Sequence, residues 1–302
     1  MTEFLRELFG VSQPIIAMVH LQALPGRPRH DRAAGLRPIV DAVARDLGAL
    51  QDAGVDGLLF CNEADLPYQL RVQPEAVAAM AAVIGELRTD ISRPFGVNLV
   101  WDPVASLAVA RATGASFVRE VVTGTYESDL GVMRPDFGAI AAYRSAIGAD
   151  GVAIFANITP EFASTLGRRT IAARARSAAF LGVEALLISG AITGEPTDLA
   201  QLREARAAVS SAGAGEVPVL ANTGVTADTV AGVLEIADGV IVGTALKAGG
   251  VTWNPVDPAR AAAFMTVATN ARATNARATN ARATNARATN ARARANAVAV
   301  AT

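Results

Sequence analysis

Residues 14–20 read PIIAMVH and lead into LQALPGRPRH (21–30), so an apolar, β-branched run ends in a histidine and opens into a loop rich in Pro, Gly and Arg. Continuous apolar runs of this length are typical of parallel strands that are buried on both faces. The same pattern recurs along the chain at residues 57–63, 94–101, 116–122, 151–158, 184–190, 217–225 and 239–247.

A helical pattern follows each of these apolar runs, and the last one covers residues 257–268. Eight strand–helix units in roughly 250 residues predict an α/β fold of the closed (β/α)8, or TIM barrel, type. The alternative is an open, doubly wound sheet, which usually carries its glycine-rich turn after the first strand. Here the glycine-rich turns follow the sixth, seventh and eighth strands, which favours the barrel.

The composition narrows the class of protein. Hydrophobic residues make up 51% of the chain, which is ample for a large core. We find no apolar run of about 18–20 residues that would span a bilayer, and the N-terminus MTEFLRELFG lacks the apolar stretch of a secretory signal. Cys61 is the only cysteine, which excludes an internal disulfide and a cysteine-rich metal site. We therefore expect a cytoplasmic protein, and the alternative is a protein that contacts the membrane peripherally.

The C-terminal segment 268–302 differs from the rest of the chain. It begins with five copies of ATNAR and contains six arginines and no acidic residue, so the remainder carries a net charge of −7. A five-residue period forms no apolar stripe on a helix. We expect one domain over 1–267 and a disordered or frayed helical tail over 268–302. The alternative is a basic arm that contacts anionic lipid or nucleic acid, whereas the acidic body argues against nucleic acid as a partner of the barrel.

Strand ends locate the candidate active site, because TIM barrels carry their chemistry at the carboxyl ends of the strands. His20 ends the first strand, and it is either a general acid or base or a histidine that orders the neighbouring loop. Arg119 and Glu120 are adjacent in a strand, so only one of them faces the barrel axis. The candidate catalytic residues are His20, Glu63, Asn98, Asp102 and Arg119.

The glycine-rich turns after the last three strands predict a phosphate site, because barrels often bind phosphate with the loops after strands 7 and 8. Glycine lets backbone N–H groups approach phosphate oxygens, and a helix N-terminus favours an anion. The alternative is that these are tight turns that merely require glycine. The candidate phosphate-binding residues are Gly190, Thr193, Gly194, Asn222, Gly224, Gly243 and Thr244.

Metal binding has little support in the sequence. Glu63, Asp65, Asp102 and His20 include the oxygen ligands that Mg²⁺ prefers, but no spacing requires them to converge. We therefore predict no metal site and no cofactor, with Mg²⁺ as the alternative. A lysine Schiff base would have to use Lys247, the only lysine in the chain.

The motifs resemble those of the BtpA/SgcQ family from about residue 11 to 266. The matching stretches are MVHLQALPG (18–26), AGVDGLLFCNE (53–63), FGVNLV (95–100), FVRE (117–120), SGAITGEP (189–196), ADGVIVGTALKAGG (237–250) and NPVDPAR (254–260). The first and last of these stretches are the most specific. The resemblance implies a ribulose-phosphate-binding type of barrel. The family's founding role is in the biogenesis of photosystem I at the membrane, which cannot hold for members from organisms without photosynthesis.

The chain departs from the family pattern on the side opposite the phosphate turns. Cys61-Asn62-Glu63 stands where the family has Glu-Asn, Asp102-Pro103 stands where it has Asn-Asp, and an Asp and a Lys are missing near Asn157 and Glu161. Two hypotheses follow. One is an enzyme acting by acid–base chemistry on a small phosphorylated metabolite, and the other is a non-catalytic assembly factor for a membrane complex. Both allow a homo-oligomer.

Overall fold

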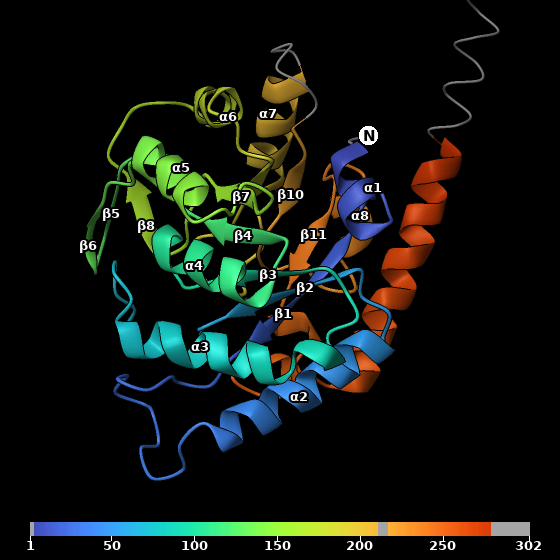
Figure 1. Ribbon diagram of the computed structural model, residues 1–302. Helices are drawn as coiled ribbons and strands as arrows, with labels where there is room; N and C mark the ends of the chain where they lie inside the picture. Colours follow the sequence, from blue (N-terminus) through green and yellow to red (C-terminus); the bar gives the residue numbers. More distant parts are fainter. Residues whose placement is uncertain (1–2, 211–216, 279–302) are drawn as a thin grey trace, which may run out of the picture.

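A barrel of eight parallel strands forms the centre of the computed structural model, which describes residues 3–210 and 217–278 (Figure 1). The strands are short and their side chains are almost all buried, as the apolar runs predict. They are β1 (Ile15–His20), β2 (Gly57–Cys61), β3 (Phe95–Asn98), β4 (Phe117–Glu120), β7 (Ala153–Asn157), β9 (Ala185–Ile188), β10 (Val219–Ala221) and β11 (Val240–Val242).

The barrel is closed by pairing of the first strand with the last. Ile16 of β1 is in register with Ile241 of β11, and on its other edge β1 pairs with β2, where His20 lies beside Cys61. An open, doubly wound sheet would leave β1 and β11 unpaired with each other. The predicted (β/α)8 fold is therefore confirmed.

Helices surround the barrel and connect successive strands. Their starts follow local rules: α2 and α3 have a proline in the first turn, and Asp102, Asp136 and Thr170 each accept a hydrogen bond from a backbone N–H of the helix that they cap. The outer helices are α2 (Arg37–Asp52), α3 (Pro74–Glu86), α4 (Pro103–Thr113), α5 (Phe137–Ala146), α6 (Ile171–Phe180), α7 (Leu199–Ser210), α8 (Val230–Leu234) and a C-terminal helix over 258–278.

The described chain also contains short 3-10 helices, which are η1 (Arg88–Asp90), η2 (Thr244–Leu246) and η3 (Ala248–Gly250). The helix after β10 is short. It begins at Val230 after Thr229, because Thr226 holds a turn in which its N–H donates to the Thr229 hydroxyl at 2.9 Å.

An N-terminal helix, α1 (Glu3–Phe9), closes the amino-terminal end of the barrel, and the strand–helix pattern did not predict it. Phe9 packs edge-to-face on Phe117 at 5.6 Å between ring centroids, and Phe117 stacks on Phe155 at 4.6 Å. A side chain at Gly57 would overlap the Phe9 ring, because its Cβ would lie 2.6 Å from a ring carbon. The lower barrel interior is thus filled by aromatic rings from three segments of the chain.

A small antiparallel sheet stands beside the barrel mouth and was also not predicted (Figure 1). It comprises β5 (Tyr126–Ser128), β6 (Gly131–Met133) and β8 (Ala163–Thr165), in the order β6-β5-β8. The sheet joins the loop after β4 to the loop after β7. Phe162 directly precedes β8, so the sheet fixes the position of this residue at the mouth.

The C-terminal helix extends past the boundary expected after residue 267. Ala268 is fully buried, and Arg272 donates to the Asp56 carboxylate at 2.6 Å. Asn275 donates to the backbone carbonyl of Leu234 at 2.9 Å. The first ATNAR repeats therefore pack on the barrel without an apolar stripe, because alanine and long polar side chains contact the loops. Residues 279–302 of the expected tail lie outside the described residues.

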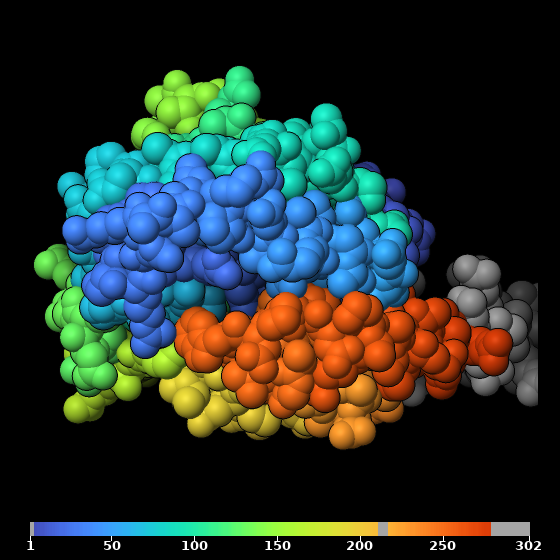
Figure 2. Space-filling model, turned by 90° about the horizontal axis from the view of Figure 1, so that it is seen from below, coloured from blue at the N-terminus to red at the C-terminus, as the bar shows by residue number. Residues whose placement is uncertain are grey.

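The C-terminal helix and the segment before it border α2 on one face of the molecule (Figure 2). Asp46 of α2 accepts hydrogen bonds from Lys247 at 2.6 Å and from the backbone of Val256 at 2.8 Å. In the part of the chain that the structure describes, no helix combines the length and the apolarity that a membrane crossing requires.

The plug formed by α1 predicts a large loss of stability in Phe9→Ala. Truncating a buried phenylalanine costs about 3–5 kcal/mol, and urea unfolding should show a loss of this size. Glu7→Ala, an exposed change in the same helix, should alter the free energy of unfolding by less than about 0.5 kcal/mol. Equal effects of the two changes would show that α1 contributes nothing to barrel stability.

The repeats offer a matched pair, because Arg272 and Arg277 occupy the same position in consecutive copies of ATNAR. Arg272→Ala removes a charged hydrogen bond to Asp56 and should lower the free energy of unfolding by about 1–2 kcal/mol. Arg277 is exposed, so Arg277→Ala should have an effect within about 0.5 kcal/mol. A melting temperature that is unchanged in Arg272→Ala would place the domain boundary before this repeat.

Candidate functional site

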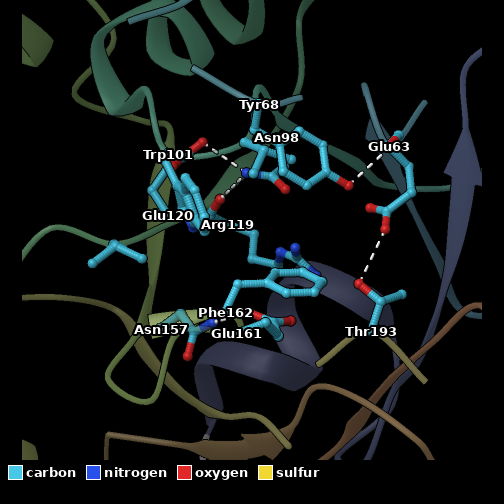
Figure 3. Close-up of a pocket in the computed structure, with 12 residues that line it drawn as sticks. Glu63, Tyr68, Asn98, Trp101, Arg119, Glu120, Asn157, Glu161, Phe162 and Thr193 are labelled. Carbon is cyan, nitrogen blue, oxygen red and sulfur yellow. Dashed lines mark hydrogen bonds between the residues drawn. The ribbon is translucent and has the colours of Figure 1, made fainter. Parts of the chain in front are cut away.

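A polar pocket lies in the barrel mouth, at the carboxyl ends of the strands (Figure 3). Three carboxyl groups, two amides and one guanidinium line it together with three aromatic rings. The free volume is only about 20 Å³, enough for about one water molecule. The principal lining residues are Glu63, Asn98, Arg119, Glu120, Asn157, Glu161, Thr193, Tyr68, Trp101 and Phe162.

Arg119 and Glu120 point to opposite faces of β4, as their adjacency requires. Arg119 reaches across the mouth and donates to the Asn222 side-chain oxygen at 3.2 Å. Glu120 turns toward α4. Its Oε1 accepts hydrogen bonds from the Ser106 hydroxyl of α4 at 2.5 Å and from the side-chain amide of Asn98 at 2.8 Å. The axial member of the pair is therefore Arg119, and Glu120 borders the same pocket from the side.

Glu120 is the most perturbed carboxyl group of the pocket. Its Oε2 is buried and has no hydrogen-bond partner among the described residues. Burial raises the pKa of Glu120 from 4.5 to about 8, against the opposing effect of the donors Ser106 and Asn98. The side chain is therefore mainly protonated at neutral pH, so that its O–H is a potential proton donor.

A hydrogen-bonded network links the ends of β7, β9 and β10. Asn157 donates to Glu161 at 2.9 Å and to Ser189 at 3.0 Å, and Asn222 donates to Ser189 at 2.7 Å. Burial raises the pKa of Glu161, whereas the nearby Arg119 lowers it. The network fixes Asn222, and Asn222 in turn fixes the Arg119 guanidinium.

Glu63 lies on the opposite side of the mouth from this network. The loop after β9 crosses to it, and the Thr193 hydroxyl donates to Glu63 Oε1 at 3.1 Å. The Tyr68 hydroxyl donates to the backbone carbonyl of Glu63 at 2.9 Å. The position of Glu63 thus depends on a loop that comes from the far side of the barrel (Figure 3).

Two aromatic residues of the pocket adopt left-handed backbone conformations. Trp101 has φ 69° and Phe162 has φ 59°, and these are the only non-glycine residues with positive φ in the described chain. Tyr68 contacts both rings, at centroid distances of 5.8 and 6.4 Å. Such conformations cost of order 1–3 kcal/mol each and cluster at functional sites. Both residues with this strained backbone conformation therefore line the pocket.

His20 ends β1 as expected, but it lies in a groove beside the pocket rather than inside it. Glu63 borders both cavities. Burial lowers the pKa of His20 to about 4, with Glu63 opposing this shift and Lys247 and Arg119 adding to it. The imidazole is neutral at pH 7, so this environment does not give the titration near neutral pH that a histidine beside a carboxylate suggests.

The predicted phosphate residues fall into separate groups. Thr193 lines the pocket, and Asn222 accepts a hydrogen bond from Arg119, which also lines it. Gly190 and Gly224 pack against the loop backbone, because a Cβ at either would lie 2.5 Å or less from the carbonyl oxygen of Glu195. Gly194 approaches the Thr244 side chain, Gly243 approaches the His20 ring, and Thr244 shares a hydrogen bond with Thr252 at 2.8 Å.

Several other candidates have local structural partners. Asp102 caps α4 through the Ala105 N–H at 3.0 Å and also accepts from Val72 at 2.8 Å. Asp65 accepts from the Leu24 N–H at 2.7 Å. Lys247 is buried against Asp46. The structure does not bring His20, Glu63, Asp65 and Asp102 together, and no group of three or more potential metal ligands is found among the described residues.

Sequence reasoning missed several members of the pocket. Glu161, Tyr68 and Phe162 lie in loops outside the barrel strands. The sequence left open whether Arg119 or Glu120 faces the axis, and only Arg119 was taken as a candidate. A carboxylate four residues after the strand-end Asn157 was the one available signal for Glu161. The aromatic residues carry no local pattern, because only the loop paths bring them to the mouth.

Comparison with known proteins identifies relatives over most of the chain. The BtpA family model matches residues 11–270. The chain is 45% identical over 263 residues to the putative sgc region protein SgcQ of Escherichia coli, covering 87% of this chain and 96% of that protein. It is 30% identical over 263 residues to the photosystem I biogenesis protein BtpA of Synechocystis, covering 86% and 89%.

Among solved structures, the thiamine phosphate pyrophosphorylase of Pyrococcus furiosus superposes with a TM-score of 0.50 at 16% identity, covering 86% of this chain and 98% of that one. This likeness supports the barrel fold alone. The family model spans the whole barrel, and the motifs at the ends of β1 and β11 lie within it. The chain belongs to the BtpA family.

Proposed function

We propose that this protein binds a small phosphorylated metabolite at the barrel mouth and performs acid–base chemistry on it. The observation that carries the proposal is Glu120, a buried carboxyl group with an unpartnered oxygen at the edge of a pocket that also contains Arg119. In a structural carboxylate elsewhere in the chain, Asp102, both oxygens are used. One accepts from the Ala105 N–H at the start of α4, and the other accepts from the Val72 N–H. Glu120 has an unused proton-transfer atom instead.

Glu120 and Glu63 have complementary roles in this proposal. Glu120, with a pKa of about 8, is the general acid, since a catalytic group works best with a pKa near the working pH. Glu63, on the other side of the pocket, is the second proton-transfer group. Arg119 lies between them and stabilises negative charge that develops on the ligand. His20, being neutral, hydrogen-bonds the ligand.

The phosphate is placed at the turn of Gly243 and Thr244. Thr244 begins η2, and the first N–H groups of a helix have no acceptor within it. Thr252 contacts Thr244 and also lines the groove of His20. Because the mouth pocket has room for about one water molecule, the reacting end of the ligand enters it only when the side chain of Phe162, whose surface is 43% exposed, moves aside.

The second candidate function is that of an assembly factor, by analogy with the name of the Synechocystis relative. Phe180 at the end of α6 favours it, since 85% of its surface is exposed and the adjacent Leu181 is 44% exposed. Such a pair is a possible contact with a membrane complex or with a second copy of the chain. Pull-down of a membrane complex that is lost in Phe180→Ser would support this function.

Ligand binding is tested by thermal shift with phosphorylated metabolites and their unphosphorylated counterparts. A ligand specific for the native state adds about 2.7 kcal/mol at 100 times its Kd, so the melting temperature should rise only with the phosphorylated member of a pair. With a ligand in hand, Glu120→Gln should lower turnover by ~10²–10⁴, whereas Glu127→Gln, an exposed change, should leave it unaltered. No shift with any phosphorylated compound would refute the proposal.

The raised pKa of Glu120 also predicts a pH-dependent stability. Between pH 5 and 8 the folded protein holds a proton on Glu120 that the unfolded chain, with a pKa near 4.5, has released. Stability therefore falls as the pH rises through this window. Glu120→Gln removes this contribution, so the variant should gain stability relative to the wild type from pH 5 to pH 8.5 in urea unfolding. Glu127→Gln should show no such gain, and parallel curves for Glu120→Gln and wild type would contradict the assignment.

A further inference from the structure

The groove beside the mouth is the larger of the two cavities in this region. Its volume is about 520 Å³, within the range of small-molecule sites. It lies between the loop over 21–36, α2 and the segment that follows η2, on the side of the molecule where α2 borders the C-terminal segment (Figure 2). Its inner end is formed by His20 and Glu63.

Each acidic side chain of the groove accepts a hydrogen bond, but only Asp46 has an ion-pair partner. Asp46 is held by Lys247, and Asp31 accepts from the backbone of its own turn at 3.0 Å. Glu63 accepts from Thr193. The remaining histidine, His30, bonds the Ala23 carbonyl at 2.8 Å.

Two arginines of the groove have no such partner. Arg29 and Arg45 are exposed, and neither forms an ion pair with a carboxylate of the described chain. By contrast, Arg37 on the same helix as Arg45 pairs with Asp41 and Glu86. Guanidinium groups match the geometry of phosphate oxygens and bind them in a bidentate manner. Arg29 and Arg45 are therefore two guanidinium groups of the groove that no carboxylate of the described chain binds directly.

Trp253 positions one of these arginines. The Arg29 guanidinium lies over the indole ring at 5.9 Å from its centroid, within the range of a cation–π contact. Trp253 is 53% exposed, so the ring is packed on one side and open to the groove on the other. The contact limits the rotamers of Arg29 and holds its N–H groups at the groove.

The inner end of the groove contains a buried hydrogen-bonding atom, the Nδ1 of His20, next to the Glu63 carboxyl group. His20 Nδ1 is buried and has no partner among the described residues. The ring is neutral at pH 7, so it can exchange hydrogen bonds with a hydroxyl group. The groove thus combines a cationic rim with a hydroxyl-binding end.

We propose that this groove binds an organic phosphate, with the phosphoryl group on Arg29 and Arg45 and the hydroxyl-bearing body directed toward His20 and Glu63. The site is separate from the Gly243–Thr244 turn. The inference rests on the proposed function only in taking the ligand to be phosphorylated, and binding is measured without turnover.

The two tryptophans allow a direct test, because Trp101 lines the mouth pocket and Trp253 lines the groove. In Trp101→Phe the only indole is Trp253, and glucose 6-phosphate should change its emission in a saturable manner. Glucose should produce no change, and inorganic phosphate should bind at least tenfold more weakly. Titration calorimetry on the protein with both tryptophans measures the same Kd independently of the Trp101 substitution.

Substitution of the rim arginines provides the decisive comparison. The double variant Arg29→Gln/Arg45→Gln should raise the calorimetric Kd for glucose 6-phosphate at least tenfold. The control Arg6→Gln/Arg93→Gln makes the same charge change at exposed positions outside the groove and should leave the Kd unchanged. An unchanged Kd in the rim variant, or equal affinity for glucose or inorganic phosphate, would overturn the inference. Loss of turnover in Glu120→Gln with the Kd retained would leave it intact, so the two proposals fail separately.

Discussion

The pairing of β1 with β11 is the constraint on which the site depends. It closes the sheet, so that the carboxyl ends of strands far apart in the sequence meet around one axis. Arg119 can then reach Asn222, and Thr193 can reach Glu63, across the mouth. In an open sheet these strand ends would lie along one edge instead of facing each other around an axis. The α1 plug fills the other end with aromatic rings, so the interior is apolar below and polar above.

The placement of a guanidinium in the mouth explains much of the polar arrangement around it. A partly buried cation is costly unless carboxylates and amides surround it. Asn222 contacts Arg119 directly, and Asn222 is held by Ser189 and Glu161. Glu120 stands outside this network with one unpartnered oxygen, and its burial raises its pKa to about 8. The Arg119 charge thus accounts for the hydrogen-bonded network on one side of the pocket.

The loops close the site more tightly than the barrel itself does. Trp101 and Phe162 hold strained backbone conformations over the pocket, and the small sheet of β5, β6 and β8 anchors the segment that carries Phe162. The loop after β9 adds Thr193, while its backbone fills the space beside Gly224. These loops leave little room at the axis and a larger groove beside it.

The sequence by itself determined the barrel, since eight apolar runs alternating with helical patterns have few other solutions. It also indicated that Glu63, Asn98 and Arg119 lie at the mouth and that His20 ends a strand on the same face of the barrel, because the strand ends share one face. Only the tertiary structure separated Asp102, which caps a helix, from these residues, and added Glu161, Tyr68 and Phe162 from loops. It also showed that the first ATNAR repeats pack on the barrel through Arg272 and Ala268. The physical reason is that strand periodicity is local, whereas loop paths, buried charge partners and pKa values depend on contacts between distant segments.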